Sequence, residues 1–463
     1  MSISQLIEMS RRSFRTLDAA INTVSQNIAN VNTPGYTRRR ITLQADSLAS
    51  NGVIMRTPLG SATGTGVSIQ AYQRVRDGLL AAAGWDARTS LGAAQEDQRL
   101  LGALEGIFPV GEGSINDQLD SFWNAWADLA DHPTDNGVRV ALRSKASGLV
   151  STLNRTDEAL SLFQEGTEGV LAVGVDEINQ TLREIGELNE TIQTARYTGS
   201  PDLVAEDRRD FLIKDLAAYG PVRMHDDPQT GYTVTFNGMT VVQGRNVFEL
   251  NLDTSGATPR VFYGDTTVEY NAKAGDDGQL GAWLRMLNQT LPDTRQALDD
   301  VAAALVTEIN TIHSAGYGLD GGTGRDFFDA TALSAGSIRL STDVLADSQA
   351  IAASGDPTAL GDSTVALDIA NLRTQSVLNG GSETIETFVT NLVAGIGASV
   401  QQASLQAVGQ TAVLDHLMGM ERGVSGVSLD EEMTNLIQYQ QAFAASARVL
   451  NTAQQMFDTL LNL

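Results

Sequence analysis

The chain contains no cysteine among its 463 residues. Disulfides, thiolate-bound zinc, iron–sulfur clusters and cysteine nucleophiles are therefore excluded, and packing has to stabilise the fold. Lysine is also scarce, since only Lys145, Lys214 and Lys273 occur. The 56 acidic residues outnumber the 31 basic ones and give a net charge of −25. Such a charge disfavours binding to nucleic acid or to an anionic membrane.

Long apolar runs are missing as well. No stretch approaches the roughly 18 consecutive apolar residues of a membrane-spanning helix, and the first residues lack the apolar core of a cleavable secretion signal. We therefore expect neither membrane insertion nor a cleaved leader. The remaining composition, with 42% hydrophobic, 6% aromatic and 19% charged residues, is typical of a foldable chain rich in small side chains.

The patterns of catalytic and metal sites are also absent. The four histidines lie far apart in the sequence and lack the spacing of metal ligands, so we expect them to be structural or exposed. Residues 316–321 match GxGxxG, but they follow a helical pattern and so predict a turn and no dinucleotide site. Asp320 and Asp326 are separated by glycines where a calcium loop needs ligands. We predict no catalytic residue, no metal and no cofactor, and we do not expect an enzyme.

The two ends of the chain carry narrow apolar stripes at heptad spacing, a pattern typical of helices that pack against other helices. Proline and glycine at 34 and 35 end the first helix. The N-terminal stripe consists of Ile3, Ile7, Phe14, Leu17, Ile21, Val24, Ile28 and Val31. The C-terminal stripe consists of Leu429, Met433, Leu436, Phe443, Ala447, Leu450, Phe457 and Leu461. We predict that both stripes form an assembly interface.

The balance of free energies predicts when these ends fold. The backbone entropy lost by ordering both helices exceeds the gain from burying the stripes of a single pair. Residues 1–40 carry a net charge of +4 and residues 428–463 a net charge of −3, but exposed pairs of opposite charge contribute little. We therefore predict that both ends are disordered in the free monomer and become ordered in an assembly.

Between the ends the pattern is mostly helical. Residues 41–75 predict an extended linker, and helical spacing runs from about 77 to 217. Trp123 and Trp126 fall on an apolar stripe and are expected in the core. Helical spacing returns at 280–313, with a break at Pro292, and at 383–421. Residues 337–341 predict a strand.

The period changes to two after Pro221, where Asn237-Gly238 between alternating residues predicts a hairpin. Short strands are expected to follow at 247–250, 260–263 and 268–270. The predicted fold class is mainly α with a β-rich insert: a long helical bundle built from both halves of the chain, terminal coiled-coil helices and a small antiparallel β domain. The predicted parts are residues 1–40 and 426–463 (terminal helices), 41–220 and 276–425 (bundle), and 221–275 (β insert).

Several motifs resemble a known family. Asn-Ile-Ala-Asn-Val-Asn-Thr-Pro-Gly-Tyr at 27–36, followed by Thr-Arg-Arg-Arg, resembles the start of bacterial flagellar axial proteins, and residues 428–461 resemble their C-terminal helix. Residues 122–149 and 309–320 are similar to the hook-associated branch of this family, which forms the hook–filament junction. The chain departs from the family at 10–14, where Ser-Arg-Arg-Ser-Phe replaces small apolar residues, and after residue 328, where the outer domain of longer members is expected to be missing.

This resemblance implies a structural protein that joins the hook to the filament as a homo-oligomeric ring outside the cell. The implied neighbours are the hook protein on one side and the second hook–filament junction protein on the other. The resemblance also implies export through the flagellar type III apparatus without a cleavable signal peptide. A cytosolic export chaperone is expected on the C-terminal stripe, since an uncovered apolar face invites aggregation.

Three alternatives remain open at this point. The chain could be another axial protein, such as a hook or rod subunit, because the terminal motifs are shared across the family. It could be a secreted coiled-coil adhesin or effector that keeps the terminal helices. An enzyme hidden in the β insert is the third alternative.

Overall fold

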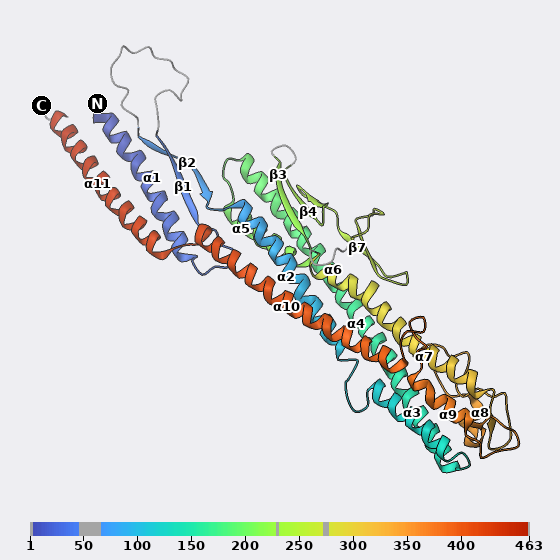
Figure 1. The fold of residues 1–463 in the computed structure, drawn as a ribbon. Coiled ribbons are helices and arrows are strands. Elements are labelled where there is room, and N and C mark those ends of the chain that lie inside the picture. Colours follow the sequence, from blue (N-terminus) through green and yellow to red (C-terminus); the bar gives the residue numbers. More distant parts are fainter. Residues whose placement is uncertain (1–2, 46–65, 228–230, 272–276, 462–463) are drawn as a thin grey trace.

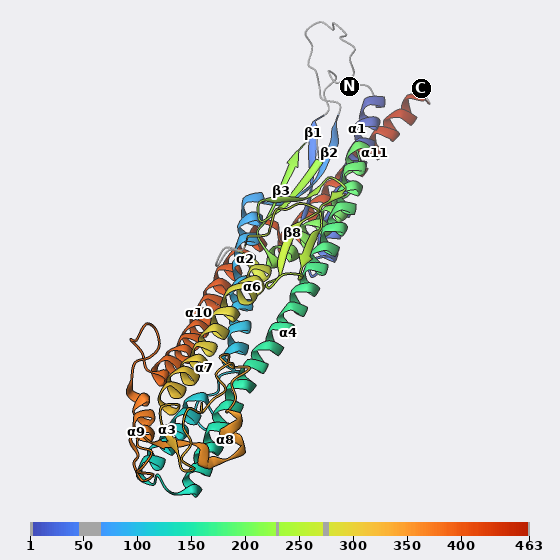
Figure 2. The same cartoon turned by 90° about the vertical axis from the view of Figure 1, so that its right-hand side faces the viewer.

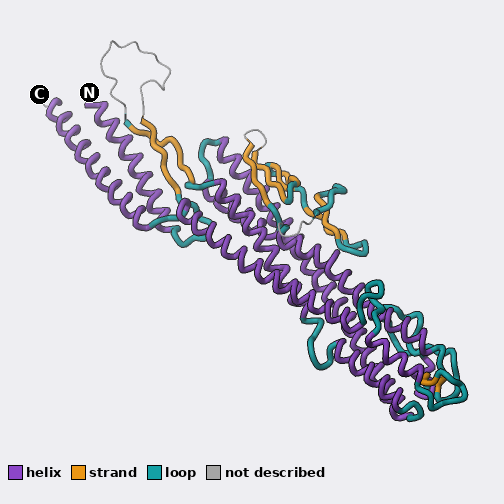
Figure 3. The backbone as a smooth tube through the Cα atoms, viewed as in Figure 1, coloured by secondary structure: helices purple, strands orange, loops and turns teal. Residues whose placement is uncertain are grey.

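The computed structural model of the protein describes residues 3–45, 66–227, 231–271 and 277–461. These residues form a long rod of roughly parallel helices, with both termini at one end and small sheets along one side (Figure 1). The tube in Figure 3 shows that strands are few and short beside the helices. The predicted fold class, mainly α with small antiparallel sheets, is confirmed.

The helices divide into a terminal pair, a bundle and short helices at the far end of the rod. Their bounds are α1 (Ile3–Ala29), α2 (Gly78–Glu105), α3 (Ile115–Asp131), α4 (Asn136–Tyr197), α5 (Leu203–Tyr219), α6 (Gly278–Arg285), α7 (Leu291–His313), α8 (Thr342–Ala346), α9 (Thr364–Asn371), α10 (Ile385–Ser425) and α11 (Leu429–Leu461). The strands are β1 (Arg39–Ala45), β2 (Val67–Arg74), β3 (Val222–Asp227), β4 (Gly231–Phe236), β5 (Met239–Gln243), β6 (Asn246–Val247), β7 (Leu250–Asp253), β8 (Arg260–Tyr263), β9 (Tyr317–Gly318) and β10 (Ala352–Ser354).

The core of the bundle is built by the apolar faces of its long helices. Helix α4 spans 62 residues and buries leucines and isoleucines along its length. Trp123 and Trp126 of α3 are 1% and 0% exposed, which confirms their expected place in the core. Trp126 packs on Phe327, with ring centroids 5.1 Å apart, so the far end of the rod closes around aromatic side chains.

The predicted break at Pro292 is a change of helical winding. A π-helical turn at Met286–Thr290 joins α6 to α7, and Pro292 is the second residue of α7. Proline has no backbone N–H and its ring crowds the preceding turn, so a wider turn relieves the clash without ending the helix. The two helices therefore run on almost without interruption.

The predicted hairpin at Asn237-Gly238 is confirmed. Both residues have positive φ, 47° and 83°, as a two-residue turn of this kind requires. Strands β3 to β6 form one antiparallel sheet in sequence order, and β7 pairs with β8 in a second. The strand expected at 268–270 amounts to a single bridge between Phe262 and Glu269.

One expectation for an extended segment was wrong. Residues 337–341 form only one bridge, between Phe328 and Leu340. The Asn154 side chain donates hydrogen bonds to nearby backbone carbonyls, which replaces a strand ladder there. The segment predicted as an extended linker, 41–75, is extended over 41–45 and 67–74. These stretches belong to β1 and β2, which pair antiparallel with Ile41 opposite Tyr72. Residues 46–65 of that linker lie outside the described residues.

Candidate functional site: an assembly interface

The two terminal helices lie side by side at one end of the rod and run in opposite directions (Figures 1 and 2). Phe14 of α1 meets Phe443 of α11 edge to face, with ring centroids 4.8 Å apart. The Ser13 and Ser446 hydroxyls are 3.5 Å apart. Both predicted stripes therefore contribute to one helix pair.

The pair covers only part of these stripes. In the N-terminal stripe Val24 is buried, and Ile7, Phe14, Leu17, Ile21, Ile28 and Val31 are half-buried. In the C-terminal stripe Leu436, Ala447 and Leu450 are half-buried, whereas Leu429, Met433, Phe443 and Phe457 are 38–48% exposed. The side chains of Ile3 and Leu461 lie outside the described residues.

Further apolar side chains of α11 are exposed outside this stripe. Ile437, Val449 and Met456 are 50%, 46% and 53% exposed. One helix can contact only one face of another, so α1 alone leaves much of α11 uncovered. Exposed apolar side chains gathered on one helix mark a site of protein–protein contact.

A polar cluster that the sequence did not reveal holds α11 to the segment after α1. The carboxylate of Glu432, only 2% exposed, lies 2.7 Å from the Arg38 guanidinium and accepts a hydrogen bond from Asn27 Nδ2 at 3.1 Å. Asn27 in turn accepts a hydrogen bond from the Tyr36 hydroxyl at 2.8 Å. Burial raises the pKa of Tyr36, so its hydroxyl keeps its proton. We call Asn27, Tyr36, Arg38 and Glu432 the terminal clasp.

A second cluster fixes the β1–β2 ribbon to the bundle. Arg74 of β2 lies within 2.8–3.1 Å of Glu206, Asp207 and Asp210 of α5. Burial opposes the charge of Arg74, but the attraction of Asp210 and Glu206 outweighs it and raises the arginine pKa. Arg39 of β1 also reaches Asp207, at 3.3 Å. The terminal pair is thus tied to the rod through charged groups.

The loop between α1 and β1 lies between two cavities of about 650 and 560 Å³. Gly35 of this loop has φ +79°, and a Cβ atom there would lie 3.1 Å from the Phe211 ring of α5. Glycine is therefore required both by the backbone conformation and by the close approach of the aromatic ring.

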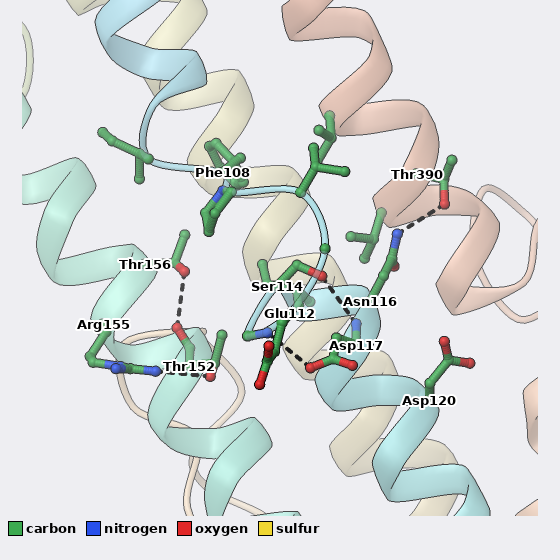
Figure 4. Close-up of a pocket in the computed structure, with 18 of the residues that line it drawn as sticks. Phe108, Glu112, Ser114, Asn116, Asp117, Asp120, Thr152, Arg155, Thr156 and Thr390 are labelled. Atoms are coloured by element: carbon green, nitrogen blue, oxygen red, sulfur yellow. Dashed lines mark hydrogen bonds between the residues drawn. The ribbon is translucent and has the colours of Figure 1, made fainter.

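A third cavity, of about 910 Å³, lies far from the terminal helices, between the α2–α3 loop, α4 and α10 (Figure 4). Its polar groups are mostly engaged in structural bonds. Ser114 Oγ caps α3 by accepting from the Asp117 N–H, and Asn116 Nδ2 donates to Thr390 Oγ1 at 3.0 Å. Asp120 pairs with Arg373. This lining holds no arrangement of nucleophile and base.

His313 is a structural histidine. It is 1% exposed, and its Nε2 accepts a hydrogen bond from the Ala352 N–H while Nδ1 donates to the Arg325 carbonyl. Burial lowers its pKa to about 4. The predicted turn at 316–321 is confirmed by a hydrogen bond from the Gly321 N–H to the Gly318 carbonyl. The described ranges contain no cluster of three potential metal ligands, and none of their helices combines the length and hydrophobicity of a membrane span.

Three family models match the chain in order along the sequence. Residues 15–37 match the flagella basal body rod protein family, residues 101–328 match the flagellar hook-associated protein FlgK helical domain, and residues 424–463 match the flagellar basal body rod FlgEFG protein C-terminal family. The two terminal matches cover the second half of α1 and the whole of α11.

Relatives align with nearly the whole chain. Flagellar hook-associated protein 1 of Bacillus subtilis is 27% identical, covering 98% of this chain and 97% of that protein. The protein of the same name from Escherichia coli is 26% identical over 556 aligned positions, with full coverage of both. Because this chain has 463 residues, the alignment includes insertions in the relative.

The fold is shared with a solved structure. The flagellar hook junction protein FlgK from Burkholderia pseudomallei superposes with a TM-score of 0.65 and 15% identity, covering 74% of this chain and 100% of that chain. The three matching models and the full-length relatives together show that the protein belongs to the flagellar hook-associated protein 1 family and is a structural, axial component of the bacterial flagellum.

Proposed function

We propose that this chain forms a ring of subunits at the hook–filament junction, with hook protein on one side and the second junction protein on the other. The observation that carries the proposal is the terminal helix pair, whose α11 face remains uncovered although half of its stripe packs on α1. The full-length similarity to flagellar hook-associated protein 1 supports the position at the junction.

The geometry gives this ring a plausible physical basis. Neighbouring terminal pairs would bury the exposed side chains of α11 and build an inner tube. Each side chain that is about half exposed returns roughly 1 kcal/mol when it is buried. The bundle would form the next shell, and the terminal clasp and the Arg74 cluster would transmit load between the two shells.

The same uncovered face bears on the state of the chain before assembly. We propose that residues 1–40 and 426–463 are disordered in the free monomer and that an export chaperone covers α11 in the cytosol. Export would follow the flagellar type III route without a cleaved signal. Hydrogen exchange of a confirmed monomer tests this proposal, and protected amides in α1 and α11 would refute it.

Deletion of the terminal helices tests the function. A strain that produces only residues 33–428 should make hooks without filaments and release monomeric filament protein, as should a strain without the gene. Hooks capped with filaments in the truncated strain would show that our assignment of the terminal helices is wrong.

Purified full-length chain separates the remaining candidates. A junction protein should cap isolated hooks as a short zone, whereas long tubes would identify a hook or rod subunit. An enzyme in the β insert would require turnover by the fragment 76–425.

A further inference from the structure

Helix α10 has a surface that is unusual for a protein of this charge. It runs along the outside of the rod for 41 residues and has no charged residue from position 387 to position 414. Its inward face buries Ile385, Val389, Ile396, Ala403, Ala407 and Leu414. The outward positions are threonine, serine, asparagine, glutamine, alanine and glycine, together with Leu405, Val408 and Val413, which are 65%, 68% and 48% exposed.

Helix α4 has an exposed face that carries charged residues except near its middle. It presents charged side chains to solvent both before and after its middle, such as Glu158 and Asp176. Between them lies an apolar strip at helical spacing, composed of Leu162, Gly166, Gly169, Val170 and Val173. Leu162, Val170 and Val173 are 63%, 39% and 59% exposed. All of the strip except Leu162 lines a shallow hollow of about 370 Å³, together with Glu177, Tyr219 and Trp283.

The two surfaces lie on different sides of the rod. Figure 2 shows α10 along one side and α4 along the other, with α6 and α7 between them. The α10 face and the α4 strip lie at similar positions along the long axis of the rod, as contacts through α6 and α2 indicate. Trp283 of α6 touches Gly174 of α4 and donates a hydrogen bond to Glu96 of α2.

Helix α2 relates this position along the rod to residues of α10. Glu105, nine residues beyond Glu96 in α2, lies against Gly397. Because α2 and α10 run in opposite directions, Glu96 is level with residues near 406 of α10 (Figure 1). The α4 strip and the exposed side chains of α10 are therefore within a few helical turns of the same height.

We propose that the uncharged face of α10 packs on the α4 strip of a second copy of this chain. This inference rests on the proposed ring and names its lateral contact. Two copies that each carry a net charge of −25 repel one another wherever charged faces meet, and the α10 face is a long surface that avoids this repulsion. A contact between two different faces of one subunit repeats from copy to copy and can close into a ring.

The chemistry of the two faces also fits. Glycine at 166 and 169 leaves open space on α4, since a Cβ atom there would meet nothing within 4 Å. The larger side chains Leu405 and Val408 of α10 can fill such a hollow. Helix α10 ends next to α11, so the lateral contact would continue directly into the exposed apolar face of α11.

Cross-linking of assembled flagella tests the contact, because the full-length chain has no cysteine of its own. Double variants Val170→Cys/Val408→Cys and Val173→Cys/Leu405→Cys, treated with a short bifunctional maleimide, should give a ladder of covalent oligomers. Each single-cysteine variant should give none.

The matched control places a cysteine on the same face of α4 but at a different position along the helix axis. Thr191 is exposed on that face, 18 residues beyond Val173, or about 27 Å along the helix. The pair Thr191→Cys/Val408→Cys should therefore not form the ladder. A ladder from this control, or none from the two test pairs, would overturn the contact.

A charge on the α10 face provides a second measurement. Val408→Asp should lower the fraction of hooks that carry filaments roughly tenfold, because the carboxylate would be buried against an acidic neighbour. Leu79→Asp, at a side chain that is 86% exposed on α2, should leave this fraction unchanged. Both variants should keep the unfolding midpoint of the parent chain, so loss of assembly cannot come from misfolding.

The outcomes separate this inference from the proposed function. Immunogold labelling of the full-length parent chain should mark the hook–filament junction, and labelling elsewhere would remove the proposed function itself. Labelling at the junction, combined with normal assembly of Val408→Asp and no cross-linked ladder, would overturn only the lateral contact.

Discussion

The bundle and the terminal helix pair use similar apolar spacing but differ in how completely they bury it. In the bundle Trp126 and Leu129 are 0% exposed. In the terminal pair Phe443 and Phe457 are 38% and 46% exposed, although they lie on an equally regular stripe. The difference follows from the number of neighbours, since each bundle helix packs on several others (Figure 2).

A heptad stripe specifies an apolar face but does not specify which partner covers it. The bundle completes its core within one chain. The terminal pair buries only part of its apolar stripes. It is also held by the terminal clasp, in which Glu432 is 2% exposed and contacts Arg38 and Asn27. We therefore expect mutations in the two regions to have different consequences for the free monomer and for the assembly.

The largest effect is expected for a truncation in the bundle core. Trp126→Ala should lower the free energy of unfolding of the monomer by about 3–5 kcal/mol, because it leaves a cavity among buried aromatic rings. Phe443→Ala should change it by less than about 0.5 kcal/mol if α11 is disordered before assembly, as proposed. Urea unfolding of both full-length variants measures the difference.

The matched control for this comparison is Trp126→Phe. The indole N–H of Trp126 is buried without a hydrogen-bond partner, so the variant should lose much less stability than Trp126→Ala. Equal losses in Trp126→Ala and Phe443→Ala would contradict the distinction between the two regions.

Acid should weaken the bundle through His313. Its pKa in the folded state is lowered to about 4 by burial, so the unfolded chain binds a proton near pH 6.5 that the folded chain does not bind. The stabilisation is complete above pH 6.5 and is lost as the pH falls toward 4, by about 3 kcal/mol at most. His313→Gln should remove this part of the pH dependence, measured by urea unfolding at pH 7 and pH 4.5.

His416 serves as the control for titration, because it is exposed on α10. His416→Gln should leave the difference in unfolding free energy between the two pH values unchanged. An unchanged pH dependence in His313→Gln would show that other groups cause the loss in acid.

Local signals made much of this fold predictable. The Asn237-Gly238 turn could be found because its two residues favour positive φ. The break expected at Pro292 is instead a π-helical turn within a continuous helix. The terminal stripes and the buried tryptophans followed from helical periodicity. Each of these features depends on residues that are close in sequence.

The features that escaped prediction depend on distant residues. Arg38 and Glu432 are 394 positions apart, and nothing near either residue indicates the other. Strands β1 and β2 pair across residues 46–65, so no turn signal marked them as a ribbon. Which residues of the C-terminal stripe stay exposed also depends on distant residues, because it is set by how many helices surround α11.

A smaller effect is expected for the terminal clasp, and only in the assembly. Glu432→Gln removes the charge that faces Arg38 and should weaken the attachment of α11 by about 2 kcal/mol. In isolated hook–filament complexes, amide exchange in α11 should then be roughly 30-fold faster, while exchange in the bundle stays the same. Glu431→Gln is the control, since Glu431 also contacts Arg38 but is 63% exposed. Equal effects of the two variants would show that the buried position of Glu432 does not matter.

The smallest effect distinguishes the two regions most directly, because it compares two glycines with similar backbone conformations. Gly238 in the β insert has φ +83° and open space around it, and Gly35 in the terminal loop has φ +79° and lies against Phe211. Gly238→Ala should lower the free energy of unfolding of the monomer by about 1 kcal/mol, because alanine is strained at positive φ. Gly35→Ala is more crowded in the structure, yet it should cost the monomer less than about 0.5 kcal/mol if residues 1–40 are disordered before assembly. A larger loss for Gly35→Ala than for Gly238→Ala in urea unfolding would mean that the terminal loop is already folded against α5 in the free chain, and the contrast between a finished bundle and an unfinished terminal pair would then be wrong.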